Sequence, residues 1–188
     1  IGDIYYGQKE HNKALEKYLQ AINHYEIINS RVDLYPLYEK ASLIYGKELN
    51  NLKKSLIYSK KALKDLIIIG ADNYLIAYNY KKVADTYIYL KDYENALVNY
   101  QNSINLYKIL NSDRKGEKIA ADEDIISNMV QISVCYSASS KYGKLFEKYE
   151  ETIEYAKNNN HYKVGKLYLM KFKSYDKLGI DFEKVEEF

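Results

Sequence analysis

Apolar and polar positions along the chain alternate with the period of a helix. The clearest stretch is YLKDYENALVNYQNSINLYKIL, at residues 89–110. Within it Ala96, Tyr100 and Ser103 stand four and then three positions apart, so they share one face of a helix. A neighbouring backbone can approach closely only where small residues stand. The pattern therefore predicts a helix that packs against its neighbours through small side chains.

The same order of side-chain sizes returns in three other segments. Ala14, Ser55 and Ala96 are each 41 residues apart, and Leu145 follows 49 residues after Ala96. A period of this length is typical of a solenoid built from repeated helix pairs. In the shared register the four segments are KALEKYLQAI (13–22), KSLIYSKKAL (54–63), NALVNYQNSI (95–104) and KLFEKYEETI (144–153).

A second helical pattern precedes each of these segments and ends in a polar turn. In the best copy Tyr80, Val83, Ala84 and Tyr87 form its apolar face, and residues 91–94 turn the chain. The pairing resembles the tetratricopeptide repeat, whose consensus has a large residue, Leu, Gly and Tyr in its first helix and Ala, a large aromatic and Ala in its second. The resemblance covers nearly the whole chain. It implies an all-α fold, a right-handed superhelix of antiparallel helix pairs.

The resemblance implies a single repeat domain over residues 1–188, and we expect this domain to be a fragment of a longer protein. The family's Pro near the end of the second helix is absent, with Glu26 and Lys108 in its place, so the second helices can run longer. Such extended repeats look like those of bacterial tetratricopeptide sensor and regulator proteins. The expected copies span about residues 1–30, 31–70, 71–111, 121–160 and 161–188, the first and last being partial.

Local signals predict where several helices begin and end. Gly70 can end one helix in the left-handed conformation, and Asp72 can cap the next. Pro36 is expected near the start of a first helix, where a missing N–H costs little. Residues 111–124 are expected to form one long polar connection. An alternative for residues 66–69, LIII, is a β-strand, although their apolar positions keep helical spacing with the residues before them.

Composition and charge restrict the classes of partner. The chain has 28 basic and 26 acidic residues, a net charge of +2, which argues against direct binding of nucleic acid. RNA could still stack on some of the 23 tyrosines. No apolar run approaches the roughly 18 residues of a membrane helix, so we expect no membrane insertion. The single cysteine, Cys135, cannot form an internal disulfide, which is compatible with a cytoplasmic protein.

The resemblance also implies a binding surface, because the first helices of stacked repeats line one concave groove. The expected lining mixes aromatic, aliphatic and charged residues of both signs, which suits an extended peptide or a partner helix. Asp3 and Ser127 fall at lining positions. The expected partner-binding residues are Tyr6, Glu39, Leu43, Tyr78, Lys81, Asp85, Ile88, Tyr89, Val130, Val134, Lys166, Leu169 and Lys173.

One well-known mode of the family grips a terminal carboxylate with Lys and Asn side chains on neighbouring repeats. Lys81 fits the place of a clamp lysine. Asp85, however, stands where the clamp uses Asn, and its charge would repel a carboxylate ligand. The sequence therefore favours a different mode of peptide binding.

Signals for catalysis, a cofactor or a metal are lacking. The chain has no Gly-rich phosphate loop and no nucleophile elbow. His11, His24 and His161 fall in different copies and are expected on the surface, whereas Cys135 is expected to be buried. The acidic residues at 121–125 suit a helix N-terminus. The lysines at 53, 54, 60, 61 and 64 are expected on the solvated convex face of a second helix.

These observations predict a non-enzymatic scaffold without a cofactor or a metal. We expect its partner to be a protein or peptide held in the concave groove, with the chain acting as an adaptor or a ligand-sensing region. One alternative is a structural segment that self-associates through its exposed terminal repeats. Another is the regulatory repeat region of a larger signalling protein, such as a kinase or a DNA-binding regulator.

Overall fold

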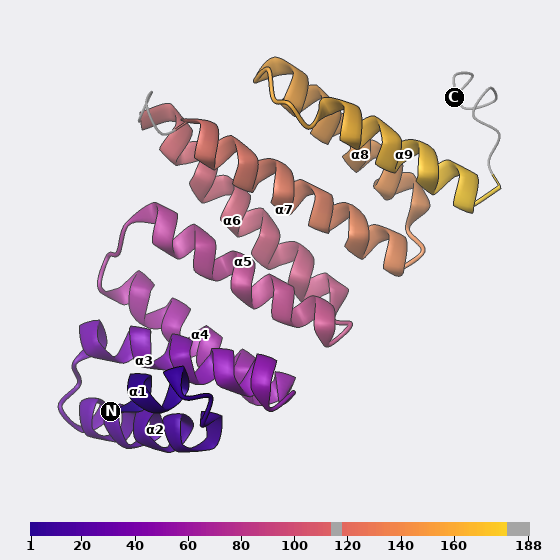
Figure 1. Cartoon of the computed structure of the whole chain (residues 1–188). Helices are drawn as coiled ribbons and strands as arrows, with labels where there is room; N and C mark the ends of the chain where they lie inside the picture. The colour runs from indigo at the N-terminus through magenta and orange to yellow at the C-terminus, as the bar shows by residue number, and fades with distance from the viewer. Residues whose placement is uncertain (114–117, 180–188) are drawn as a thin grey trace. The chain divides into compact units, whose positions relative to one another are not determined.

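The computed structural model describes residues 1–113 and 118–179, with side chains at 1–110 and 121–179 (Figure 1). Within these ranges the regular structure is helical and contains no strand. The helices are α1 (Gly2–Gly7), α2 (His11–Ile27), α3 (Arg31–Leu43), α4 (Leu52–Ile68), α5 (Asn73–Tyr89), α6 (Tyr93–Asp113), α7 (Lys118–Ala138), α8 (Tyr142–Asn158) and α9 (Val164–Lys177), and a π-helical turn η1 (Ile44–Glu48) continues α3.

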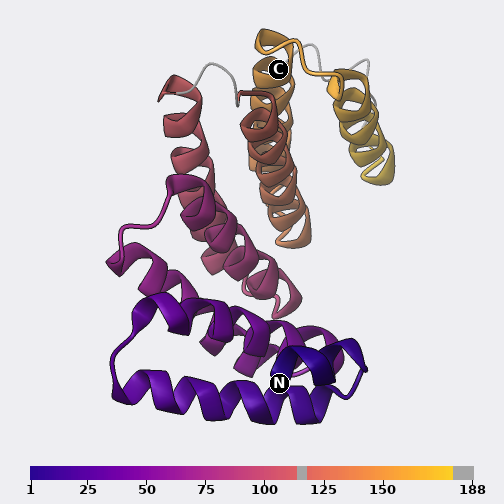
Figure 2. The same cartoon turned by 60° about the vertical axis from the view of Figure 1, so that its left-hand side comes forward.

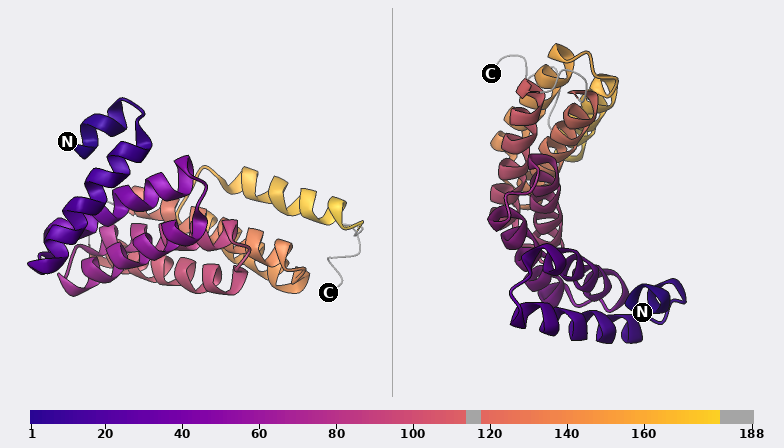
Figure 3. Two further views of the ribbon diagram at one scale, coloured as in Figure 1. Left: turned by 90° about the horizontal axis from the view of Figure 1, so that it is seen from below. Right: turned by 90° about the vertical axis from the view of Figure 1, so that its left-hand side faces the viewer.

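The chain forms two compact units, Ile1–Leu106 and Tyr107–Phe188. In the first unit α1 packs on α2, α2 on α3, α3 on α4 and α4 on α5. In the second unit α7 packs on α8, and α8 packs on α9. Figures 2 and 3 show that consecutive helices within each unit run antiparallel. Within each unit these helices therefore lie next to their neighbours in sequence, as in a repeat protein.

Small side chains occupy the contacts between helices of the first unit. Ala96, Tyr100 and Ser103 of α6 have no exposed surface, as their spacing predicts. Tyr18 of α2 is also buried. A methyl group at the contact lets two helix backbones approach closely, and larger rings then fill the space beside it. The alanines that are completely buried in this unit are Ala14, Ala41, Ala62, Ala77, Ala84 and Ala96.

Serine hydroxyls add hydrogen bonds at the closest approaches. Ser42 Oγ of α3 donates to the carbonyl of Ser55 at 2.9 Å, and Ser55 Oγ of α4 donates to the carbonyl of Ser42 at 2.9 Å. Ser103 Oγ of α6 donates to the carbonyl of Ala77 in α5 at 2.7 Å. A Cβ at Gly46 would lie 2.9 Å from Ser55 Oγ, so a larger residue here would displace this hydroxyl. These serines satisfy their own polar groups while they keep the helices close.

The helix boundaries confirm the signals at residues 70 and 72. Gly70 has φ +64°, and Asp72 accepts a hydrogen bond from the Tyr74 N–H at 2.8 Å. The β-strand alternative for residues 66–69 is wrong, because α4 continues through Ile68. Other turns use a left-handed residue that is not glycine, which residue type alone does not reveal. These residues are Lys9, Asn29, Asn50, Lys91, Ser140 and Asn160.

Two predicted boundaries are wrong. Pro36 does not lie near a helix start, because α3 begins at Arg31 and the proline falls inside it. The predicted connection at residues 111–124 is largely helix, since α6 continues to Asp113 and α7 begins at Lys118. Polar composition suggested a loop, but a helix whose outer face is solvated carries the same residues. The end of the last expected copy, at residues 180–188, lies outside the described residues.

Candidate partner-binding face

Two ion pairs join the first helices of the first unit. Lys40 Nζ of α3 lies 2.7 Å from Asp3 Oδ1 of α1. Lys82 Nζ of α5 lies 2.8 Å from Glu39 Oε1 of α3. These contacts place one side of α1, α3 and α5 on a common surface. We call it the first-helix face, with residues Asp3, Tyr6, Glu39, Lys40, Leu43, Tyr78, Lys81, Lys82, Asp85, Ile88 and Tyr89.

Two tyrosines give this face its exposed aromatic surface. The exposed fractions of Tyr78 and Tyr89 are 42% and 71%. Lys82 Nζ lies 5.6 Å from the centre of the Tyr78 ring. The Lys82 ammonium group is therefore bound both by the Glu39 carboxylate and by this ring. The other predicted positions on the face, Tyr6, Glu39, Leu43, Lys81, Asp85 and Ile88, are half-buried. The face therefore presents rings and half-buried side chains around charges that are already paired.

Asp85 is anchored to the core rather than to solvent. Its carboxylate accepts a hydrogen bond from the buried Tyr100 hydroxyl. Burial raises the pKa of Asp85 above its usual value, while the Tyr100 hydrogen bond and the Lys81 charge act in the opposite direction. Asp3 stands at the matching place, where the hydrogen bond from Lys40 and then that from Tyr18 lower its pKa. The sequence argument treated Asp85 only as a charge facing a ligand.

The predicted residues of the second unit lie on α7 and α9. Val130 and Val134 are one turn apart on α7, half-buried and exposed respectively. Lys166, Leu169 and Lys173 share one exposed side of α9. Within the described chain, neither Lys166 nor Lys173 forms an ion pair. On each of these two helices the predicted residues thus lie on one side. Their use as a single binding surface stays a prediction.

Sequence reasoning missed Lys40 and Lys82. Both lysines stand next to predicted positions and bridge two first helices instead of projecting freely. Their partners lie 37 and 43 residues earlier, close to the 41-residue period. A search for oppositely charged residues about 41 positions apart in the sequence could have predicted these two ion pairs.

The histidines depart in part from their expected places. His24 is exposed. His11 Nε2 lies 3.3 Å from Glu48 Oε2, and the His11 and Tyr6 rings meet edge to face. His161 is buried, so its expected place on the surface is wrong. It stacks on Tyr162 in the turn between α8 and α9, where its Nε2 lies 3.8 Å from Glu123 Oε2 of α7. The sequence suggested exposure because the three histidines fall in different copies and have no partners at metal-like spacing.

The acidic residues of α7 hold other helices. Buried Asp122 accepts a hydrogen bond from Tyr155 Oη at 2.6 Å. Glu123 pairs with Lys163 and accepts from Tyr162 Oη at 3.0 Å. Because α7 begins at Lys118, these acids lie beyond the first turn of the helix, contrary to the expected position. In the described part of the chain, no group of three or more His, Cys, Asp or Glu residues could hold a metal ion.

Cys135 lies in the core of the second unit, as predicted. It has no exposed surface, and burial raises its pKa to about 11. A thiol in this state is a poor nucleophile at neutral pH.

No helix in the described ranges has the length and apolar character needed to cross a membrane.

Comparison with known proteins fixes the class of fold. No family model matches the sequence, and no curated protein matches it. The structure is similar to that of BtubC (BKLC) from P. vanneervenii, with a TM-score of 0.67 and 15% identity over 86% of this chain. The same TM-score is found for a putative kinesin light chain of Podosopora anserina with nearly identical TPR-like repeats, at 11% identity over 99% of this chain and 87% of that one.

The chain has a tetratricopeptide-like (TPR-like) repeat fold. A STAND protein with a tetratricopeptide repeat sensor, from Pyrococcus horikoshii, is also similar, with a TM-score of 0.53 and 16% identity over 94% of this chain. This chain spans 62% of the length of BtubC and 30% of the STAND protein. The all-α repeat fold is confirmed. The TPR-like chain is thus built from stacked helices, each packed mainly on its neighbours in sequence.

Proposed function

We propose that this TPR-like chain is a non-enzymatic scaffold that binds an extended peptide segment of a partner protein on its first-helix face. The observation that carries the proposal is the exposure of Tyr78 and Tyr89 on one side of α5. Tyrosine offers a large apolar surface and a hydroxyl at a low cost in side-chain entropy. In repeat proteins the stacked helices form extended surfaces that take such segments.

The charges of the face restrict the ligand. Glu39 pairs with Lys82 and Asp3 pairs with Lys40, so these four groups are neutralised within the protein. A highly charged ligand would therefore compete with these pairs for the same groups. We therefore propose a ligand with aromatic or aliphatic side chains that lie on Tyr78 and Tyr89.

A sensing role in a larger regulator is part of the proposal. The STAND protein from Pyrococcus horikoshii carries its tetratricopeptide repeats as a sensor. A similar arrangement here would let peptide binding on the first-helix face control another domain of the same protein.

The proposal is tested with peptides selected from a random phage-displayed library on the wild-type chain. Fluorescence polarisation measures their affinity for the wild type and for the Tyr78→Ala, Lys81→Ala, Tyr89→Ala triple variant. We expect the triple variant to lose binding while its helical circular dichroism is unchanged. Tyr162→Ala, which removes a tyrosine of the second unit that is 75% exposed, should bind like the wild type. Full affinity in the triple variant would refute the assignment.

Self-association is a second candidate, favoured by one observation. Ile4 of α1 is 63% exposed, and Ile1, just before this helix, is 81% exposed. A second copy that packed on them would remove this apolar area from water. Sedimentation velocity over a range of concentrations tests it, with Ile4→Asp as the variant. Dimerisation that this substitution abolishes would support assembly, and a monomer at every concentration would exclude it.

A further inference from the structure

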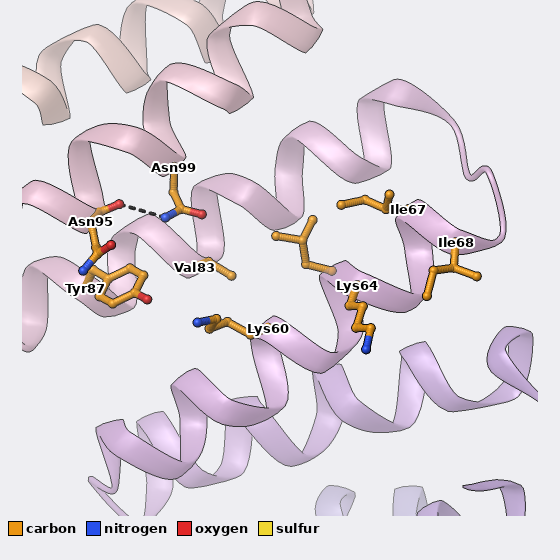
Figure 4. Close-up of a pocket in the computed structure, with 9 residues that line it drawn as sticks. Lys60, Lys64, Ile67, Ile68, Val83, Tyr87, Asn95 and Asn99 are labelled. Atoms are coloured by element: carbon orange, nitrogen blue, oxygen red, sulfur yellow. Dashed lines mark hydrogen bonds between the residues drawn. The ribbon is translucent and has the colours of Figure 1, made fainter. Parts of the chain in front are cut away.

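A cleft of about 410 Å³ opens between α4, α5 and α6, on the side of the second helices (Figure 4). Its floor is apolar and formed by Leu63, Val83 and Tyr87. Lys60 extends from α4 toward Val83 and Tyr87, while two asparagines of α6 stand opposite. Ligand pockets in proteins usually measure roughly 300–1,000 Å³. The cleft can therefore receive side chains of a partner, and it does not belong to the first-helix face.

The cleft is positively charged. Lys60 and Lys64 line it, and no acidic residue does. Across the described residues, neither of these two lysines forms an ion pair. The acids of the smaller cleft that Lys64 also borders are already bound, since Arg31 lies 2.6 Å from Asp65 and Lys61 lies 2.8 Å from Glu26.

Asp92, which lies just before α6, also has hydrogen-bond partners. The Asp92 carboxylate accepts from the Asn95 N–H at 3.2 Å and from the Asn95 side-chain amide at 2.7 Å. Asn99 in turn donates to the Asn95 carbonyl at 2.8 Å, as the dashed line in Figure 4 shows. None of these contacts involves Lys60 or Lys64, which stand without an ion-pair partner in the described chain beside an apolar floor.

Charged and apolar side chains alternate along the α4 side of the cleft. Lys60, Leu63, Lys64 and Ile67 follow the i, i+3, i+4, i+7 spacing of one helix face. Ile67 and Ile68 at the rim are 47% and 52% exposed. The two lysines are one turn apart, a rise of about 6 Å. Glutamates at i and i+4 of a partner helix have the same separation, and leucines at i+3 and i+7 share their face.

We propose that this cleft docks an acidic amphipathic helix of a partner protein. The glutamates of this helix would pair with Lys60 and Lys64, and its leucines would enter the cleft over Leu63, Val83 and Tyr87. Charge complementarity selects the partner, because neither lysine forms an ion pair within the described residues. Apolar surface between the lysines favours a protein helix over a polyanion, whose phosphates would leave that surface in contact with water.

The test measures fluorescence anisotropy of a labelled helical peptide with the repeat Glu-x-x-Leu-Glu-x-x-Leu, where x is Ala or Gln, on the whole chain. We expect binding that weakens as salt increases, and no binding of the same peptide with Lys in place of Glu. Lys60→Glu with Lys64→Glu should weaken binding about tenfold or more, whereas Lys47→Glu with Lys53→Glu should change it less than about twofold. The control pair removes two exposed lysines from outside the cleft.

Further variants and a nucleic-acid ligand distinguish this cleft from other possible binding sites. Lys60→Gln with Lys64→Gln repeats the test if the glutamate pair does not fold, as judged by its circular dichroism melt. The Tyr78, Lys81, Tyr89 triple variant should bind the acidic peptide normally, which distinguishes this cleft from the first-helix face. Equal losses in the cleft and control pairs, no binding of the acidic peptide, or tighter binding of an oligouridylate would each overturn the proposal.

Discussion

The hydroxyl of Tyr18 donates a hydrogen bond to Asp3 at 2.6 Å. Tyr100 makes the same contact with Asp85, and both members of this second pair stand 82 residues further along the chain. In each case a buried ring on the second helix reaches an acid on the first helix of the same pair. The two copies with the clearest repeat pattern therefore share a polar contact as well as their small residues. At the corresponding place of α8, Tyr149 has a neutral partner instead, since its Oη lies 3.2 Å from Ser174 Oγ.

This contact predicts that the Tyr100 hydroxyl contributes to stability. Tyr100→Phe should lower the free energy of unfolding by about 1–3 kcal/mol, because Asp85 then loses its donor in a half-buried site. Urea unfolding followed by circular dichroism measures the change. Tyr149→Phe is the matched control, since it removes a hydroxyl that has a neutral partner, and it should cost less. Equal effects would show that the acid does not matter.

The buried carboxyl of Asp85 predicts a pH-dependent stability. Burial raises its pKa in the folded state, so the folded chain holds this proton more tightly than the unfolded chain does. The resulting stability is present below the ordinary pKa near 3.8 and is lost as the pH rises through the raised pKa. Asp85→Asn should therefore raise the Tm more at pH 7 than at pH 3.5. A difference that is the same at both pH values would contradict this.

The small-residue contact predicts a strong effect of size at position 96. Ala96→Leu should destabilise the chain by about 1–3 kcal/mol, because the larger side chain forces α6 away from its neighbours. The free energy of unfolding in urea gives the value. Val98→Leu, which enlarges a side chain that is 58% exposed on the same helix, should change it by less than about 0.5 kcal/mol. Similar values for the two variants would disprove tight packing at Ala96.

The raised pKa of Cys135 predicts a protected thiol. With a pKa of about 11, only about one molecule in a thousand carries the thiolate at pH 8, and the sulfur is also buried. Iodoacetamide should therefore label Cys135 slowly in the native chain and rapidly in urea, as measured by mass spectrometry. Rapid native labelling would mean that the core around α7 opens easily.

Much of the fold could be predicted because its determinants are local. Ala96 and Ser103 lie on one helix face, and Gly70 and Asp72 set helix ends by their own conformations. The helical nature of residues 111–113 and 118–124 could not be predicted from composition, because a solvated helix and a loop are both polar. The burial of His161 likewise depends on which helices pack around it.

The candidate sites were predictable only in part. The resemblance placed Tyr78 and Tyr89 on the groove-lining side of a first helix, and both are exposed. The pairing of Glu39 with Lys82 and the docking of Asp85 onto Tyr100 depend on contacts between helices, which spacing within one helix does not give. The cleft beside Lys60 was missed for the same reason, because its lining comes from three helices. Its lysines had been predicted only as a solvated surface.

The most direct test of the binding face is tyrosine nitration with and without a saturating library-selected peptide. Tetranitromethane modifies accessible tyrosines, and mass spectrometry measures the extent at each position. The account predicts that the peptide lowers nitration several-fold at Tyr78 and Tyr89 and leaves Tyr162, which is 75% exposed, unchanged. Unchanged nitration at Tyr78 and Tyr89 with the peptide bound would contradict the assignment of the first-helix face.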